Sequence, residues 1–130
     1  MLKENINLKY WNNYYKIKNL VVQPSKFAVY CKKILKSYKG VVYDVGCGNG
    51  RDVIYFNKKK IYCIGIDKSS QAILKSKKKF LFYKNHFKTK NFCKFFLKQL
   101  KNTNFSIYSR FSLHSISYEN EKKLLNSLIT

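Results

Sequence analysis

The chain has 130 residues, a length that suits one domain with a single core and is too short for two domains of ordinary size. Hydrophobic residues make up 45% and aromatic residues 17%, with five Gly and one Pro, which argues against a disordered or low-complexity chain. No uncharged stretch approaches the ~18 apolar residues of a membrane-spanning helix, and Met1 to Tyr10 lacks the apolar region of a secretory signal. We therefore expect a cytoplasmic protein with no membrane partner.

The charge is strongly basic: 27 Lys and Arg against six Asp and Glu give a formal net charge of +21. Such an excess is typical of a polyanionic partner. All but two of the basic residues are Lys, however, and Asn, Ile, Tyr and Phe are also frequent, so codons rich in A and T can account for part of the charge. The three aspartates, Asp44, Asp52 and Asp67, lie within one 24-residue window. In so basic a chain we expect them to have a role.

Neither the four cysteines nor the two histidines have the spacing of metal ligands, and no C-x-x-C pair occurs. Without a secretion signal there is no indication of an oxidising compartment. We predict free thiols and no metal site.

Residues 7–18 predict a short helix with one aromatic face, for which core packing is the simplest interpretation. That face consists of Tyr10, Trp11, Tyr14 and Tyr15. Pro24 and Ser25 open a second helix, with Ser25 as a plausible N-cap and Gly40 as its end.

The middle of the chain alternates between strand and helix patterns. Val41 to Val45 predicts a short buried strand that runs into a glycine cluster, and Arg51 to Asn57 predicts one or two helical turns. Ile61 to Ile66 predicts a second strand, followed by a helix that Ser69 or Ser70 can cap.

The stretch from Phe80 to Leu100 fits two interpretations: a strand near Lys88 to Cys93 and then a helix, or a helix from Asn91. We favour the strand. Phe105 to Ile116 predicts another strand, and Glu119 to Ile129 a final amphipathic helix. Strands that alternate with helices predict an α/β fold with a mainly parallel sheet and right-handed crossovers.

A glycine-rich loop follows the first predicted strand, in the sequence YDVGCGNG that ends at Gly50. Its three glycines let the backbone turn sharply and approach a ligand closely, because no Cβ stands in the way. A dinucleotide fold would place its third glycine at position 51, which is Arg51, so the NAD interpretation is weakened. Asp67 closes the next strand, where a carboxylate can accept both hydroxyls of a ribose held over the loop.

These residues resemble the class I S-adenosylmethionine-dependent methyltransferases, whose first motif reads acid-x-G-x-G-x-G and whose second motif is an acid closing strand two. The match is Asp44 with the loop glycines, then Asp67 within GIDKS, and it is strongest from residue 41 to 67. The resemblance implies a Rossmann-like three-layer fold and S-adenosyl-L-methionine as cofactor. The cofactor-binding residues it implies are Asp44, Gly46, Cys47, Gly48, Gly50, Asp67, Lys68 and Ser109.

By the same resemblance, Asp44 would hold the amino group of the methionine moiety and Asp67 the ribose, while the loop passes beneath the cofactor. Residues 108–114 would occupy the place of the fourth-strand motif beside the transferable methyl group. Residues 1–39 would be an N-terminal helical lid and 40–130 the cofactor-binding domain. The substrate-facing or lid residues are Trp11, Tyr14, Tyr15 and Arg110.

The role of three further residues is left open. His114 is the candidate general base because its pKa lies near neutrality, although a structural role is commoner for a lone His without an orienting partner. Asp52 lies at a helix N-terminus, where the helix dipole alone favours a carboxylate, so a structural role is as plausible as a functional one. Arg51 can pair with Asp52, with Asp67 or with the cofactor carboxylate.

The sequence departs from the family in two respects. No Asp or Glu lies between Lys68 and Tyr118 to meet the adenine amino group, so Asn91 or a backbone group would have to substitute. The family's strand order is 3-2-1-4-5-7-6, and the residues here suffice for about half of that fold, apparently truncated after strand four. We expect the open edge of strand four to pair with a second copy or with a partner chain.

The resemblance implies methyl transfer to an acceptor that the sequence does not identify, either a small molecule or a nucleic acid. The alternative is a catalytically silent cofactor-binding or nucleic-acid-binding subunit or fragment of the same fold. Ten lysines between residues 75 and 101, with aromatic residues among them, can contact phosphates and stack on bases. A solvated basic face is the simpler interpretation of those lysines.

Overall fold

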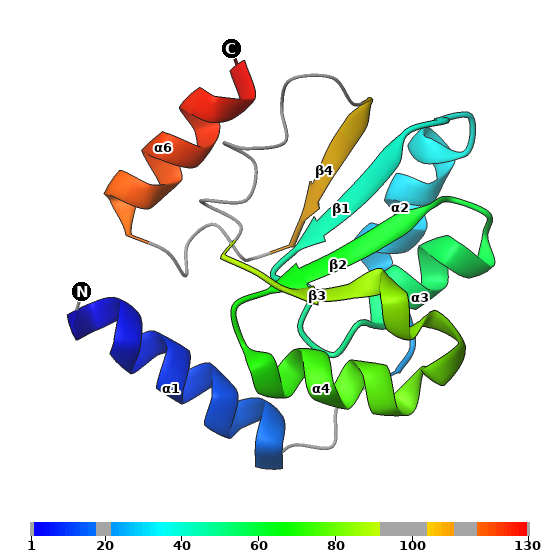
Figure 1. Cartoon of the computed structure of the whole chain (residues 1–130). Helices are drawn as coiled ribbons and strands as arrows, with labels where there is room; N and C mark the ends of the chain where they lie inside the picture. Colours follow the sequence, from blue (N-terminus) through cyan, green and yellow to red (C-terminus); the bar gives the residue numbers. More distant parts are fainter. Residues whose placement is uncertain (1, 18–21, 92–103, 111–116, 130) are drawn as a thin grey trace.

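The computed structural model describes residues 2–17, 22–91, 104–110 and 117–129. Its four strands form one sheet in the order β3-β2-β1-β4, and every neighbouring pair is parallel (Figure 1). The strands are β1 (Val41–Val45), β2 (Cys63–Asp67), β3 (Phe87–Thr89) and β4 (Phe105–Ser109). The helices are α1 (Leu2–Ile17), α2 (Lys26–Leu35), α3 (Arg51–Lys58), α4 (Ser70–Lys79), the 3₁₀ helix η1 (Leu81–His86) and α6 (Tyr118–Ile129).

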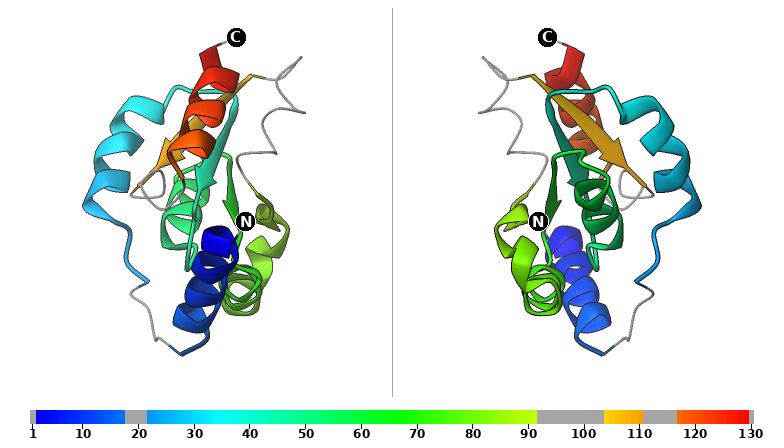
Figure 2. Two further views of the ribbon diagram at one scale, coloured as in Figure 1. Left: turned by 90° about the vertical axis from the view of Figure 1, so that its left-hand side faces the viewer. Right: turned by 90° about the vertical axis from the view of Figure 1, so that its right-hand side faces the viewer.

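Helices cover both faces of the sheet and make three layers. On one face, residues of α2, α3 and α4 form the larger core with strand residues such as Val42, Cys63 and Tyr108. On the other face, Leu124 of α6 packs with the alternate strand residues Val45 and Ile64. Figure 2 shows α2 outside α3 on the first of these sides. The predicted α/β fold with a parallel sheet is therefore confirmed, and the strand order matches the first four positions expected from the resemblance.

Serine side chains begin two of the helices, as the sequence predicted. The Ser25 hydroxyl accepts a hydrogen bond of 3.1 Å from the Ala28 N–H and so caps α2. Of the two candidates for the later helix, Ser69 is the cap, since its hydroxyl accepts from the Ala72 N–H at 3.1 Å. Both caps satisfy a backbone N–H that the first turn of a helix leaves unpaired.

Several boundaries differ from the sequence prediction. The second helix ends at Leu35 instead of continuing to Gly40. The third strand is Phe87–Thr89 rather than 88–93, because Phe87 is the residue that is buried and pairs with Gly65 while the next two are exposed. The preceding 3₁₀ helix was not predicted. The fourth strand ends at Ser109, and the continuation predicted to residue 116 lies outside the described residues, as does the segment 92–103.

The first helix is longer than predicted and lies against α4 (Figure 1). The Asn12 side-chain oxygen accepts a hydrogen bond of 2.6 Å from the Ser69 hydroxyl, which fixes α1 at the beginning of α4. Core packing of its aromatic face is only partly right, because Tyr10 is 59% exposed and the other three rings are half-buried. That face is therefore a partly open aromatic cluster beside the sheet.

Two further observations concern the described part of the chain. None of its helices combines the length and the apolar character needed to cross a lipid bilayer. Cys31, Cys47 and Cys63 are free thiols there, and no three His, Cys, Asp or Glu side chains in that part come together as a metal site would require. Strand β4 pairs with β1 and forms an edge of the described sheet, so its expected pairing with another chain stays a prediction.

Candidate functional site

The glycine loop joins the carboxyl end of β1 to the first turn of α3. Gly46, Gly48 and Gly50 have φ angles of 74°, 56° and 79°, all in the left-handed region that favours glycine. The loop is held to the neighbouring strand because the Gly46 N–H donates to the Ile66 carbonyl at 2.8 Å. The backbone conformation therefore favours glycine at all three positions of the motif.

Asp67 links this loop to the beginning of α4. One of its carboxylate oxygens accepts a hydrogen bond of 2.9 Å from the Gly48 N–H, and the other accepts one of 2.8 Å from the Ser69 N–H. Burial raises the pKa of Asp67, against the lowering effect of these two N–H groups and of the charge and backbone N–H of Lys68. An ionised carboxylate has about four acceptor positions, so Asp67 can still accept a hydrogen bond from a ligand.

Tyr15 of α1 lies over the glycine loop. A Cβ built on Gly48 would overlap the Tyr15 hydroxyl and come within 3.2 Å of the ring. Burial, and next the negative charge of Asp67, raise the pKa of the Tyr15 hydroxyl. Its ring also packs against Trp11 and Tyr14, with centroids 6.0 and 5.1 Å away. Of the aromatic residues predicted to face a substrate, Tyr15 thus contacts the loop at Gly48, and Trp11 and Tyr14 pack against its ring.

Asp44 lies on β1, one residue before the strand ends. It is 4% exposed, and burial raises the pKa of its carboxyl well above the usual value of 3.8. The nearby charges of Asp52 and Asp67 raise this pKa further, whereas the Arg110 guanidinium lowers it. A carboxylate in these surroundings is stabilised by a bound cation such as an ammonium group.

Cys47 and Lys68 differ in how they take part in the site. The Cys47 side chain points into the core, since a Cβ on Gly65 would lie 2.8 Å from its sulfur. Burial raises the pKa of the thiol well above its usual value. The Cys47 side chain is therefore part of the core, and only its backbone can face a ligand bound on the loop. Lys68 is half-buried, and its charge lowers the pKa of the neighbouring Asp67.

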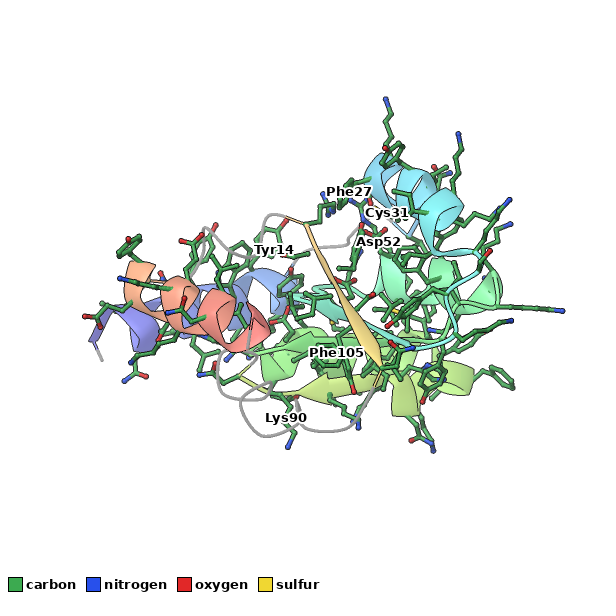
Figure 3. The ribbon with its side chains drawn as sticks, turned by 90° about the horizontal axis from the view of Figure 1, so that it is seen from above. Tyr14, Phe27, Cys31, Asp52, Lys90 and Phe105 are labelled. Atoms are coloured by element: carbon green, nitrogen blue, oxygen red, sulfur yellow. The ribbon has the colours of Figure 1, made fainter. Side chains whose placement is uncertain are left out.

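Asp52 has a structural role. Its carboxylate accepts hydrogen bonds from the Ser25 N–H at 2.8 Å, from the Ser25 hydroxyl at 2.7 Å and from the Tyr108 hydroxyl at 2.8 Å. The Arg110 Nε lies 3.7 Å from the same carboxylate. Asp52 thereby ties the beginnings of α2 and α3 to the end of β4, and Figure 3 shows it next to Cys31 of α2. The sequence left two roles open, and these contacts support the structural one.

A pocket of about 690 Å³ lies next to this network, at the carboxyl end of β4. We call it the β4 pocket. It is lined by Gln23, Pro24, Ser25, Lys26, Phe27, Arg51, Ser109 and Arg110. Ser109 and Arg110 were predicted site residues, and Arg51 had been left unassigned. Lys26 and Phe27 were missed, because only the packing of α2 against α3 brings them to the pocket.

The structure thus brings most of the predicted residues to one edge of the sheet. The glycine loop, Asp44 and Asp67 lie where β1 and β2 end, and Ser109 lies opposite Val45 at the end of β4. His114 lies outside the described residues, so its role as a general base stays a prediction. Asn91 is described and half-buried, and it follows β3 by two residues.

Comparison with known proteins supports the fold. Neither the protein-family models nor the curated proteins give a match to this chain. One solved structure comes from work on the conversion of a disulfide bond into a thioacetal group during echinomycin biosynthesis. It superposes on this chain with a TM-score of 0.72 and 18% sequence identity. The fold is Rossmann-like. The match covers 98% of this chain and 55% of that structure, so the chain spans about half the length of its structural neighbour.

Proposed function

We propose that the glycine loop binds S-adenosylmethionine and that the chain is a methyltransferase, acting on an acceptor not yet identified. The observation that carries the proposal is the Asp67 carboxylate, which accepts one hydrogen bond from the loop and one from the next helix. These bonds hold the carboxylate beside the loop, with acceptor capacity left for a ligand. The neighbouring hydroxyls of a ribose are donors that a carboxylate at the end of the second strand can bind.

The residues around the loop fit the rest of such a cofactor. The Tyr15 hydroxyl comes so close to the Gly48 backbone that a Cβ there would overlap it. A flat ligand that replaced Tyr15 could approach the loop backbone equally closely, because Gly48 has no side chain. Asp44 is a buried carboxylate that a bound ammonium group would stabilise. Tyr15 lies on the loop, so a ligand bound there contacts or displaces its ring.

The cofactor would supply a methyl group on a sulfonium, which is transferred by in-line displacement. The chain's part in that reaction is positioning, which accounts for much of the rate of such displacements. In this proposal Asp67 fixes the ribose, Asp44 fixes the amino group, and Tyr15 excludes water from the loop. The β4 pocket lies beside the loop and is the place for the acceptor.

An assay with S-adenosylmethionine labelled in its methyl group tests the activity. The chain is incubated with separate pools of small organic acids, amines and short RNAs, and label in each pool is counted. The proposal expects transfer by the wild type and much less by Asp67→Ala when the cofactor is below saturation. If the wild type binds the cofactor but transfers label to no pool, the silent cofactor-binding subunit becomes the better interpretation.

A second candidate function, binding of single-stranded nucleic acid, is favoured by a separate surface. Four rings from Tyr62 to η1 contact in series: Tyr62 with His86 at 5.2 Å, His86 with Tyr83 at 5.6 Å and Tyr83 with Phe82 at 5.0 Å. Phe82 is 90% exposed and Tyr62 53% exposed, and Lys84 beside them is exposed too. Exposed rings next to lysines are a platform on which bases stack.

Fluorescence anisotropy with a labelled 12-nucleotide poly(U) tests this second function. Binding through the ring series should weaken in Phe82→Ala and Tyr62→Ala by about fivefold or more each, since stacking contributes about 1–3 kcal/mol per base. Tyr118→Ala is the matched control, because Tyr118 is 76% exposed on α6. Unchanged binding in Phe82→Ala and Tyr62→Ala would mean that only the net charge attracts the RNA.

A further inference from the structure

The two arginines of the chain line the same pocket. Of 27 basic residues only Arg51 and Arg110 are arginines, and both line the β4 pocket together with Lys26. Arginine offers a planar fork of donors that matches a carboxylate or phosphate in two bonds, which lysine does not. Although lysine dominates the basic residues of the chain, both of its arginines lie at the β4 pocket.

Three different elements bring these cations together. Arg51 is the first residue of α3, and its Nη1 donates to the Gln23 carbonyl at 3.4 Å. Arg110 directly follows β4, its side chain is 34% exposed, and its Nε lies 3.7 Å from Asp52. Lys26 is the first residue of α2. The convergence is a product of the tertiary fold and not of a run of charges in the sequence.

Asp52, the acid beside Arg110, is already engaged. Asp52 is buried, and its carboxylate accepts three hydrogen bonds from Ser25 and Tyr108. Asp44 also interacts with Arg110, but neither aspartate lines the β4 pocket, whose lining in the described part of the chain has three cations and no acid. Such an excess of positive charge attracts an anionic ligand.

The pocket also has an apolar side and a limited size. Phe27 is 44% exposed, stacks on the Tyr108 ring with centroids 5.3 Å apart, and lines the pocket next to Pro24. Its volume of about 690 Å³ lies within the range of ~300–1,000 Å³ typical of small-molecule sites. The ligand that fits is a small molecule with an apolar body and an anionic head.

We propose that the β4 pocket binds a small organic acid or phosphate ester as the methyl acceptor, with its anionic group held by Arg51 and Arg110 and its apolar body against Phe27. The role as acceptor rests on the proposed methyltransferase function, whereas binding of the acid by the pocket does not. A carboxylate of the cofactor itself is the other anion that the arginines can bind, and the experiment separates the two.

The test measures binding of benzoate, phenyl phosphate and neutral benzamide to the full chain by calorimetry at constant ionic strength. Each titration is done without cofactor and with saturating S-adenosylhomocysteine. The proposal expects benzoate or phenyl phosphate, but not benzamide, to bind in both conditions. Arg51→Gln and Arg110→Gln should weaken that binding about tenfold or more, as loss of a charged hydrogen bond does.

Two further variants control for charge and folding. Lys77→Gln removes one charge from an exposed position on α4 and should leave binding of the anion unchanged. Arg51→Lys keeps the charge but loses the fork, and should bind the anion more weakly than the wild type. If Arg110→Gln fails to fold because Asp52 loses its neighbour, Arg51→Gln and Arg51→Lys still test whether the pocket binds the anion.

Three results would overturn the proposal. The first is binding of benzamide as tightly as benzoate, and the second is binding of the anions by the arginine variants as tightly as by Lys77→Gln. The third is a loss of affinity for S-adenosylhomocysteine in the arginine variants with their affinity for the anions kept, which would assign the arginines to the cofactor carboxylate. Failure of the proposed function looks different: the wild type then binds the anions but not S-adenosylhomocysteine.

Discussion

The Gly48 N–H and the Asp67 carboxylate are joined by a hydrogen bond of 2.9 Å across 19 residues of sequence. This bond connects the loop after β1 to the acid at the end of β2, the two features on which the family resemblance depends. It orients the carboxylate beside the loop before any ligand binds. Preorganisation of this kind lowers the entropy lost when a ligand is bound.

Gly48→Ala should destabilise the chain by about 1–2 kcal/mol, because a φ of 56° disfavours a Cβ and the Tyr15 hydroxyl occupies the space it needs. Adding Tyr15→Phe removes the overlap but not the strained backbone, so the double variant should recover only part of the loss. Urea unfolding measures both. Full stability in Gly48→Ala alone would show that the loop is not constrained as described.

Asp44→Asn should make the cofactor-free chain more stable at pH 7 and weaken binding of S-adenosylhomocysteine. Burial raises the folded-state pKa of Asp44 above its unfolded value, so the folded state binds a proton more tightly. Wild-type stability should therefore fall as the pH rises from about 4 through the raised pKa. Asp67 acts in the same direction, so the difference between wild type and Asp44→Asn isolates Asp44. A difference that does not change with pH would contradict this account.

Ser25→Ala should destabilise the chain by about 2–4 kcal/mol. The substitution removes the N-cap of α2 and one of the donors to the buried Asp52 carboxylate. Ser70→Ala, at an exposed position at the beginning of α4, is the control and should change stability by less than about 0.5 kcal/mol. Equal melting temperatures for the two variants would argue against the Asp52 network.

Trp11 should report ligand binding through its fluorescence. It is the single Trp of the chain, and its ring stacks on Tyr15, which lies over Gly48. S-Adenosylhomocysteine bound on the loop should therefore change the emission of Trp11 in a saturable way. In Asp67→Ala the change should require much more ligand. Saturating binding by calorimetry without any change in emission would mean that the ligand binds away from Tyr15.

The sequence predicted those features that depend on local chemistry. The alternation of β-branched runs with amphipathic segments gave the parallel α/β fold, and glycines at alternate positions marked the left-handed loop. Ser25 was predicted as a cap for the same reason. Its second contact, from its hydroxyl to Asp52 27 residues later, depends on how α2 packs and leaves no local pattern.

Features that arise from tertiary packing were missed. The segment from Phe80 to His86 is rich in aromatic residues without a helical or alternating period, so η1 was not predicted. The approach of Tyr15 to Gly48 and the meeting of Arg51 with Arg110 join residues far apart in the chain. The sequence shows that arginine is rare in this chain, and that rarity could have suggested an anion site. The position of the pocket could not be predicted, because it depends on tertiary packing.

The central claim is that the glycine loop and Asp67 bind S-adenosylmethionine, and calorimetric titration with S-adenosylhomocysteine tests it most directly. The account predicts one binding site per wild-type chain and a loss of about 1.5–3 kcal/mol of binding free energy in Asp67→Ala. Glu119→Ala, which removes an exposed carboxylate from α6, should bind like the wild type. Absence of binding to the folded wild type, or equal affinity in Asp67→Ala, would contradict the account.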